Sequence, residues 1–346
     1  MANNTDRRAP LALVLGCAGV RLDEAERAFF REARPCGFIL FKRNCESPDQ
    51  VRALVSDMRE AVDDPKAPVL IDQEGGRVVR LGPPHWRKPP AGAVFAALVQ
   101  RDVASAERAV YLNARLMAAE LAALGISVDC YPVLDLRRPG ASEVVGDRAL
   151  GSCPADVTRL GRAACNGLLD GGILPVIKHM PGHGRARVDS HHTLPVVDAT
   201  RAQLEASDFQ PFRALADMPI AITAHVRYEA IDTERPATIS PIVIREVMRG
   251  FIGFDGLLLT DDLSMAALEG SIAARAAASL EAGCDVALHC NGRLEEMEQV
   301  AAAVPPLAGE AARRYAAALA RLSAPAPFDV ADGRSHLAGL IGAAAA

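Results

Sequence analysis

A chain of 346 residues, half of them hydrophobic, is long enough to bury the core of one large α/β domain. Its formal net charge of −5 excludes the strongly basic surface expected of a nucleic-acid-binding protein. No apolar run reaches the ~18 residues of a transmembrane helix. The apolar stretch after the two N-terminal arginines spans only about ten residues, so we expect neither a membrane anchor nor a signal peptide.

The eight cysteines are scattered along the chain and form no CxxC pair. Several lie in apolar segments, where a reduced cysteine acts as a small hydrophobic side chain. This pattern favours a reducing compartment over a disulfide-stabilised fold. We therefore expect a cytoplasmic protein.

Short apolar runs rich in β-branched residues alternate with longer stretches of helical period. In chain order, the expected strands are 11–16, 37–41, 68–72, 127–133, 174–178, 220–225, 257–260 and 285–289. The expected helices lie near 23–33, 48–62, 102–123, 155–170, 201–216, 241–250, 266–282 and 293–303. This alternation predicts a parallel sheet closed on itself, a single (β/α)8 barrel of the TIM type. A doubly wound open sheet is the alternative, but no GxGxxG motif follows the first strand.

No linker rich in Pro, Ser or Gly divides the chain, so we expect no second domain. Residues 1–305 are expected to form the barrel. Residues 306–346 are expected to add one Ala-rich helix and a peripheral, low-complexity tail whose last residues are disordered.

Polar residues follow four of the expected strands at the point where each strand ends. The sequences there are DQEGGR, KHMPGHG, AHVR and TDD. The carboxyl ends of the strands and their loops build the active site of a barrel. Charged groups that are distant in the sequence should therefore meet in one pocket, which predicts an enzyme.

The sequence TDDLSM places two carboxylates at the end of strand 257–260. Successive side chains on a strand point to opposite sides, so Asp261 and Asp262 cannot share one role. A carboxylate held rigidly beside a bound substrate suits Asp261 to catalysis, with helix capping as the alternative. We expect Asp262 to cap a helix beginning near Ser264 or to have another structural role.

Segment 176–192 holds four of the eight histidines. Asp189 and His191 are two residues apart, so an extended loop would place both side chains on one side. The carboxylate could then accept a hydrogen bond from the imidazole, fix its tautomer and raise its basicity. A polar loop with a helix cap is the structural alternative. A Gly-containing loop such as 181–189 can move, so the position of His191 in an empty structure is left open.

A metal site is the sharper alternative for this segment. The possible ligands for zinc or another divalent ion are His179, His183, Asp189, His191 and His192. Their spacing matches none of the usual zinc signatures. Pro181, Gly182 and Gly184 suit a tight loop around a sugar better than a helix that presents ligands.

A third polar block, IDQEGGRVVR, follows strand 68–72. Asp72 ends the strand, two glycines permit a sharp turn, and Arg80 follows. A carboxylate in this position can grip a pair of sugar hydroxyls. A purely structural role for a strand-end Asp is the alternative.

Together, DQEGGRV, KHMPGHG followed by DSH, and TDDLSM resemble glycoside hydrolase family 3. Within that family the blocks are most similar to the single-domain bacterial β-N-acetylglucosaminidases of cell-wall recycling. They run in the expected order between residues 10 and 293, most of the chain. Met180 departs from the Phe that is more usual in its block, an exchange of apolar side chains of similar size.

The resemblance implies a role for each matching position. Asp261 matches the catalytic nucleophile, and Asp189 with His191 matches an Asp–His dyad that performs the acid/base work. The positions that match sugar-binding residues are Asp72, Arg80, Arg148, Lys178 and His179. Larger family members carry a second domain that commonly supplies the acid/base carboxylate. A barrel-only member must find its proton donor in its own loops.

The resemblance implies a retaining exo-β-N-acetylglucosaminidase that forms a covalent glycosyl-aspartate intermediate. The implied substrate is a peptidoglycan fragment, GlcNAc β-1,4-linked to 1,6-anhydro-MurNAc, with or without peptide. We expect a monomer with no metal or organic cofactor and no nucleic-acid or membrane partner.

Three other functions stay open at this point. A histidine acid/base leaves room for phosphate as the acceptor, which would make the enzyme a β-N-acetylglucosaminide phosphorylase. A metal-dependent barrel hydrolase and a non-catalytic sugar-binding barrel are the alternatives from other classes. A substrate-assisted route through the acetamido group needs two adjacent acids, and the opposite-facing Asp261 and Asp262 do not favour it.

Overall fold

The computed structural model describes residues 9–345. The N-terminal arginines considered for a signal peptide lie in residues 1–8, outside the described residues. The expectation of a disordered end falls in part on residue 346, which also lies outside them. None of the described helices is long and apolar enough to cross a membrane.

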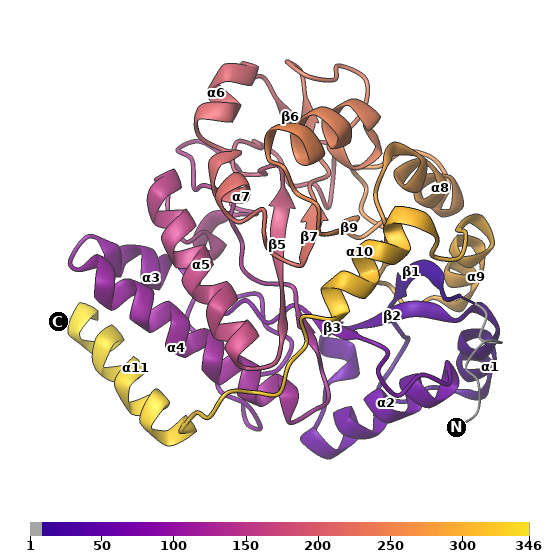
Figure 1. The fold of residues 1–346 in the computed structure, drawn as a ribbon, viewed down its shortest axis with the longest axis horizontal. Coiled ribbons are helices and arrows are strands. Elements are labelled where there is room, and N and C mark those ends of the chain that lie inside the picture. Colours follow the sequence, from indigo (N-terminus) through magenta and orange to yellow (C-terminus); the bar gives the residue numbers. More distant parts are fainter. Residues whose placement is uncertain (1–8, 346) are drawn as a thin grey trace.

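Eight parallel strands form the centre of the molecule (Figure 1). They are β1 (Leu11–Leu15), β2 (Pro35–Leu40), β3 (Val69–Ile71), β4 (Val128–Asp129), β5 (Leu174–Met180), β7 (Ile220–Thr223), β9 (Leu257–Leu259) and β10 (Ala287–His289). Their order in the sheet is β10-β1-β2-β3-β4-β5-β7-β9, and a parallel bridge between Leu259 and Val286 closes the ring. The predicted (β/α)8 barrel is therefore confirmed.

Alternate strand residues belong to two hydrophobic clusters, as the two-residue period of a strand requires. Val14, Ile39 and Leu70 pack inside the barrel, whereas Leu13 and Phe38 pack outward against the helices. Because both faces are buried, the strands are nearly continuous apolar runs. This explains why they could be recognised in the sequence.

Strand β4 is shorter than predicted. The expected strand covered 127–133, but only Val128–Asp129 pairs regularly with its neighbours. Pro132 lies in the missing part and has no N–H to donate to a ladder. An isolated bridge between Val133 and Lys178 restores contact with β5 farther along.

The helices surround the barrel and mostly fall where they were predicted. They are α1 (Glu24–Ala33), α2 (Pro48–Ala61), α3 (Gly92–Val99), α4 (Val103–Ala122), α5 (Pro154–Asp170), α6 (Arg201–Ala206), α7 (Gln210–Ala214), the π-helix η4 (Val243–Phe251), α8 (Ile272–Ala282) and α9 (Leu294–Ala303). Short 3₁₀ turns are η1 (Lys42–Asn44), η2 (Gly146–Arg148) and η3 (Ala237–Ile239). Side-chain capping explains where the first two helices start: the carboxylate of Asp23 accepts from the N–H of Glu26 at the start of α1, and Ser47 caps α2 before Pro48.

Two helix predictions were wrong in detail, and one helix was missed. The segment predicted as one helix over 201–216 forms two, α6 and α7, with an unwound turn between them. The helix expected near 266 begins only at Ile272, where Ser271 caps it. Helix α3, which was not predicted, is a short apolar segment that packs against α4.

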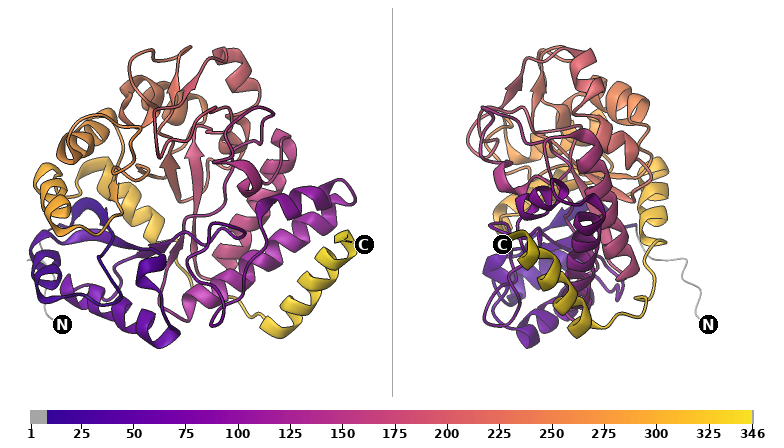
Figure 2. Two further views of the ribbon diagram at one scale, coloured as in Figure 1. Left: turned by 180° about the vertical axis from the view of Figure 1, so that it is seen from behind. Right: turned by 90° about the vertical axis from the view of Figure 1, so that its left-hand side faces the viewer.

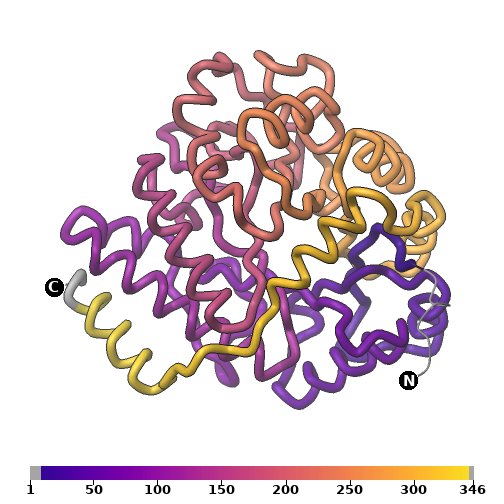
Figure 3. The backbone as a smooth tube through the Cα atoms, viewed as in Figure 1, coloured from indigo at the N-terminus to yellow at the C-terminus, as the bar shows by residue number. Residues whose placement is uncertain are grey.

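The C-terminal segment contains two helices instead of the one predicted, α10 (Gly309–Leu319) and α11 (Val330–Ala345). Helix α10 covers the amino ends of the strands, where the hydroxyl of Tyr315 donates to the carbonyl of Cys36 at 2.7 Å. The chain then crosses the molecule to α11, which lies along α4 (Figures 2 and 3). Leu337 is buried there, so packing against α4 orders a sequence that reads as low-complexity.

Candidate active site

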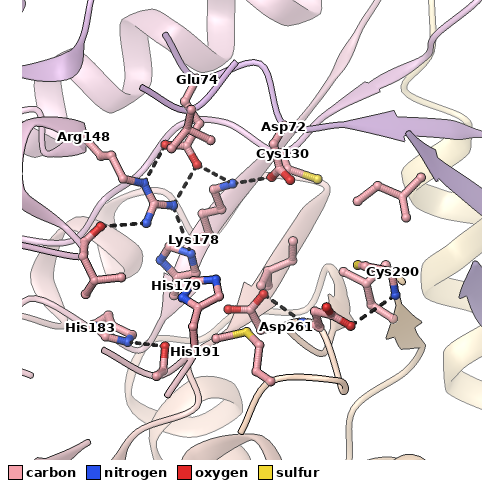
Figure 4. Close-up of a pocket in the computed structure, with 18 of the residues that line it drawn as sticks. Asp72, Glu74, Cys130, Arg148, Lys178, His179, His183, His191, Asp261 and Cys290 are labelled. Atoms are coloured by element: carbon pink, nitrogen blue, oxygen red, sulfur yellow. Dashed lines mark hydrogen bonds and ion pairs between the residues drawn. The ribbon is translucent and has the colours of Figure 1, made fainter. Parts of the chain in front are cut away.

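A cavity of about 240 Å³ opens at the carboxyl ends of the barrel strands (Figure 4). The residues after β3, β5 and β9 line it, together with residues of the loop after β4. The predicted positions found in its lining are Asp72, Arg80, Arg148, Lys178, His179, His191 and Asp261. Asp189 lies behind the lining, where it contacts His191. The structure therefore brings all eight predicted site residues together.

One wall of the cavity is a buried network of ion pairs. Asp72 accepts from Lys178 Nζ at 2.7 Å and from Arg80 at 2.8 Å through its two carboxylate oxygens. Burial favours the neutral form of Asp72, but the adjoining cations outweigh it and lower the pKa of the carboxyl group. Asp72 is therefore a rigid, ionised acceptor on the cavity wall.

Glu74 continues this network and was missed by the sequence analysis. Its two oxygens accept from Nε and Nη2 of Arg148 at 2.8 Å each, and Lys178 Nζ lies 2.7 Å from Oε1. Burial opposes ionisation of Glu74, but the two cations lower its pKa to about 2. One signal could have identified it: in the extended segment after β3, residues two apart point to the same side. Glu74 stands two positions after Asp72.

His179 is held by an acid that the sequence analysis also missed. Its Nδ1 lies 2.6 Å from Oδ2 of the fully buried Asp135. Its Nε2 faces Arg148 at 3.5 Å. Burial raises the pKa of Asp135, but the adjacent His179 and the N–H of His183 outweigh it, so the net shift is downward. An Asp inside the apolar run YPVLDL was the available signal.

Asp261 follows β9 and faces the cavity (Figure 4). Burial favours its neutral form, but His179, His225 and the backbone N–H of Asp262 outweigh burial and lower its pKa. The carboxylate is therefore ionised at neutral pH, as a nucleophile or an electrostatic stabiliser must be.

Asp262 differs from Asp261 because both of its carboxylate oxygens accept hydrogen bonds from the protein. Oδ1 accepts from the N–H of Ser264 and from the N–H of Cys290, each at 3.1 Å. The hydroxyl of Ser264 donates to Oδ2. Asp262 thus caps a turn and ties it to the end of β10. The expected helix near Ser264 is absent, because α8 starts eight residues later at Ile272.

The expected contact between Asp189 and His191 is present. Nδ1 of His191 lies 2.7 Å from Oδ1 of Asp189, and the same oxygen accepts the N–H of His191 at 2.9 Å. Burial would raise the pKa of Asp189, but these bonds lower it. The predicted extended conformation is wrong: the N–H groups of His192 and Thr193 donate to the carbonyl of Asp189, so the segment is a turn.

His191 lines the same cavity as Asp261 in this structure. The two side chains reach it from different elements, Asp261 from the end of β9 and His191 from the loop after β5 (Figure 4). That loop is braced beyond the dyad by a small parallel sheet of β6 (Val196–Val197) and β8 (Arg227–Tyr228). The sequence left the position of His191 open, and in this structure His191 lies at the cavity.

The candidate metal ligands do not form one site. Within residues 9–345, no group of three or more His, Cys, Asp and Glu side chains is placed to hold a metal ion. His179 pairs with Asp135, and His191 pairs with Asp189. His183 pairs with a hydroxyl instead of an acid. The geometry of these side chains favours proton handling and sugar contacts.

Comparison with known proteins gives a consistent assignment. The model of the glycosyl hydrolase family 3 N-terminal domain matches residues 11–323. A β-hexosaminidase of Alkalilimnicola ehrlichii is 45% identical over 283 residues, 81% of this chain and 80% of the relative. A β-hexosaminidase of Chromobacterium violaceum is 40% identical over 309 residues, 87% of this chain and 85% of the relative.

Among solved structures, NagZ from Neisseria gonorrhoeae in complex with N-trifluoroacetyl-D-glucosamine superposes with a TM-score of 0.87 at 32% identity. The superposition covers 96% of this chain and 98% of that chain. Fold, cavity and comparisons agree, and the chain belongs to glycosyl hydrolase family 3 and is a glycosidase.

Proposed function

We propose that this glycosidase is a retaining exo-β-N-acetylglucosaminidase with Asp261 as nucleophile and His191 as acid/base. The observation that carries the proposal is one cavity that holds an ionised strand-end carboxylate and an imidazole paired with its own carboxylate. The curated relatives are β-hexosaminidases, and the superposed structure holds an N-acylated glucosamine derivative. Both support an N-acetylated sugar as the substrate.

The first step forms the glycosyl-enzyme. A carboxylate oxygen of Asp261 attacks the anomeric carbon while the bond from that carbon to the leaving oxygen breaks. Protonated His191 gives its proton to the leaving oxygen. Its Nδ1 is paired with Asp189, so Nε2 serves for this transfer. Asp189 orients the ring and stabilises its charged form.

The second step releases the sugar. Neutral His191 takes a proton from water, the water oxygen attacks the anomeric carbon, and the ester bond to Asp261 breaks. Two inversions give net retention. An imidazole titrates near neutral pH, so one ring can serve first as acid and then as base.

The buried ion-pair wall suits recognition of the sugar hydroxyls. In this proposal Asp72 accepts from hydroxyl groups, and Arg80, Arg148, Lys178 and His179 donate to them. Glu74 and Asp135 hold three of these donors through the short contacts described above. Such fixed dipoles need no reorganisation when the substrate arrives.

The proposed substrate is GlcNAc β-1,4-linked to 1,6-anhydro-MurNAc, with or without peptide, released during cytoplasmic peptidoglycan recycling. We propose that the enzyme acts as a monomer without a metal or organic cofactor. The support is the likeness to the curated relatives together with eight unpaired cysteines, which suit a reducing compartment.

The test is hydrolysis of 4-nitrophenyl N-acetyl-β-glucosaminide by the wild type, Asp261→Ala and His191→Ala, beside the matching β-glucoside. We expect release from the N-acetyl substrate, no release by Asp261→Ala and strongly reduced release by His191→Ala. Early products analysed by NMR should be the β-anomer. Equal release by all three proteins would contradict both roles, and α-anomer released first would contradict retention.

A phosphorylase is the second candidate, and one observation favours it. The proposed acid/base is an imidazole, which does not repel a phosphate dianion as a carboxylate would. Assays with and without phosphate separate the two activities. A sugar 1-phosphate as main product would assign a phosphorylase, and loss of activity with chelators would point to a metal-dependent hydrolase.

A further inference from the structure

The residue between the two members of the dyad is buried, unlike its neighbours. The side chains of Asp189 and His191 are 34% and 59% exposed, whereas Ser190 is only 2% exposed. Ser190 is therefore the member of this turn that faces the protein interior. Its contacts show which parts of the protein it touches.

Two bonds from Ser190 reach different parts of the active site. Its hydroxyl lies 3.1 Å from Nε2 of His183, and its carbonyl accepts the N–H of Ala267 at 3.2 Å. Ala267 belongs to the loop that begins with Asp261. Ser190 therefore connects the dyad turn to a fixed histidine on one side and to the nucleophile's loop on the other.

His183 is a rigid partner for this contact. It is 3% exposed, and its N–H donates to Oδ1 of Asp135 at 2.6 Å, the same acid that orients His179. The adjoining Gly184 passes so close to Leu136 that a Cβ there would lie 2.1 Å from the Leu136 carbonyl oxygen. The backbone around His183 is thus tightly seated. Figure 4 shows His183 close to the segment that carries His191.

We propose that Ser190 is a positioning residue whose contact with His183 holds the Asp189–His191 dyad over the nucleophile. This inference rests on the proposed acid/base role of His191. It adds that Ser190, the buried residue of the turn, keeps His191 at the cavity. The position of His191 therefore does not depend on the contact between Asp189 and His191. Without the anchor, the dyad stays paired but its ring no longer stays where a glycosidic oxygen would need it.

The test uses the leaving group as a reporter of acid catalysis. A 2,4-dinitrophenyl leaving group departs without protonation, whereas a 4-methylphenyl group needs the acid. We compare Ser190→Ala with Thr193→Ala on the two N-acetyl-β-glucosaminides. Thr193 is exposed and, within the described part of the chain, its hydroxyl makes no hydrogen bond, so it is the matched control.

For Ser190→Ala we expect kcat/KM on the 4-methylphenyl substrate to fall by about 10- to 100-fold, with less than about a threefold change on the dinitrophenyl substrate. Thr193→Ala should match the wild type on both. Equal losses on the two substrates would show a merely structural role, and no loss on either would also overturn the proposal.

His191→Ala separates this inference from the proposed function. A strong leaving-group dependence in His191→Ala but not in Ser190→Ala would overturn the anchor and leave the acid/base role intact. No such dependence in His191→Ala would overturn the acid/base role itself.

His183→Leu removes the same contact by changing the other partner, because leucine has no group that can bond to the Ser190 hydroxyl. In a double-mutant cycle on the ratio of the two substrates, His183→Leu with Ser190→Ala should lose no more than the larger single variant, because both remove one contact. Additive losses would mean that the two residues act independently, and the proposal would fail.

Discussion

The two sides of the cavity are built in different ways. The ion-pair wall is buried and rigid: Glu74 is nearly inaccessible and pairs with Lys178 of β5 and Arg148 of η2. The dyad is exposed and belongs to a single turn, with one buried serine beneath it. A group that binds a ground-state sugar can be fixed in place. A group that exchanges protons with a leaving group and then with water must be reachable by solvent.

This contrast predicts that mutations on the two sides separate stability from catalysis. With the proposed roles, the ion-pair wall should contribute to both, since removal of one charge leaves a buried partner uncompensated. The dyad should contribute to catalysis alone, since ion pairs between exposed side chains add little to stability. The predictions below begin with the largest expected effect.

Glu74→Ala should strongly destabilise the protein. It removes an acid that pairs with both Arg148 and Lys178, and breaking a buried pair costs about 3–5 kcal/mol. Urea unfolding measures the loss, with the exposed Glu143→Ala in a neighbouring loop as control. A loss below that of the control would show that solvent already compensates these charges.

Asp189→Asn should reduce catalysis and spare stability. The amide no longer stabilises the charged imidazole, so kcat on poor leaving groups should fall by about 10- to 100-fold, a part of the roughly 10²- to 10⁴-fold that acid/base catalysis contributes. The free energy of unfolding should change by less than about 0.5 kcal/mol, as for other exposed sites. Asp198→Asn, an exposed acid farther along the same loop, is the control. A stability loss similar to that of Glu74→Ala would erase the contrast between the two sides.

Acid should weaken the ion-pair wall progressively. The pKa of Glu74 falls from its ordinary 4.5 to about 2 on folding, and that of Asp72 is lowered too. A carboxyl group with a lowered folded pKa stabilises the protein fully above its unfolded pKa, and this stability is lost as the pH falls through the folded pKa. The free energy of unfolding should therefore decline from pH 4.5 toward pH 2.

Urea midpoints at several pH values measure this decline, and Glu74→Gln should show a shallower slope than the wild type. An unchanged slope would mean that Glu74 does not titrate over this range. Asp189→Asn, which affects a more exposed acid, should reduce the slope of stability against pH less than Glu74→Gln does.

Much of the site could be predicted because it follows local patterns. Apolar runs marked the barrel strands, and Asp72, Lys178 and Asp261 stand directly at strand ends or in the residues that complete them. The topology of a closed parallel barrel then requires these ends to meet at one edge. The Asp189–His191 contact was equally local, spanning two residues, although a turn forms it and not an extended segment.

Other parts of the site depend on contacts across the fold. Glu74 meets Arg148 across 74 residues, and Asp135 orients His179 across 44. In the sequence Ser190 is an ordinary polar loop residue, and only the fold buries it and brings it to His183 and Ala267. In the same way, α11 is an Ala-rich tail until α4 packs against it.

The amino-acid sequence alone therefore determined the barrel, the order of its elements and the strand ends that carry charge. These features depend on the pattern of apolar and polar residues over a few neighbouring positions. Only the tertiary structure decided which acids hold which cations and which loop residue is buried beside the dyad. These contacts join segments that are far apart in the chain. An ion pair or a buried hydrogen bond stabilises the protein only when the fold has brought its two partners together.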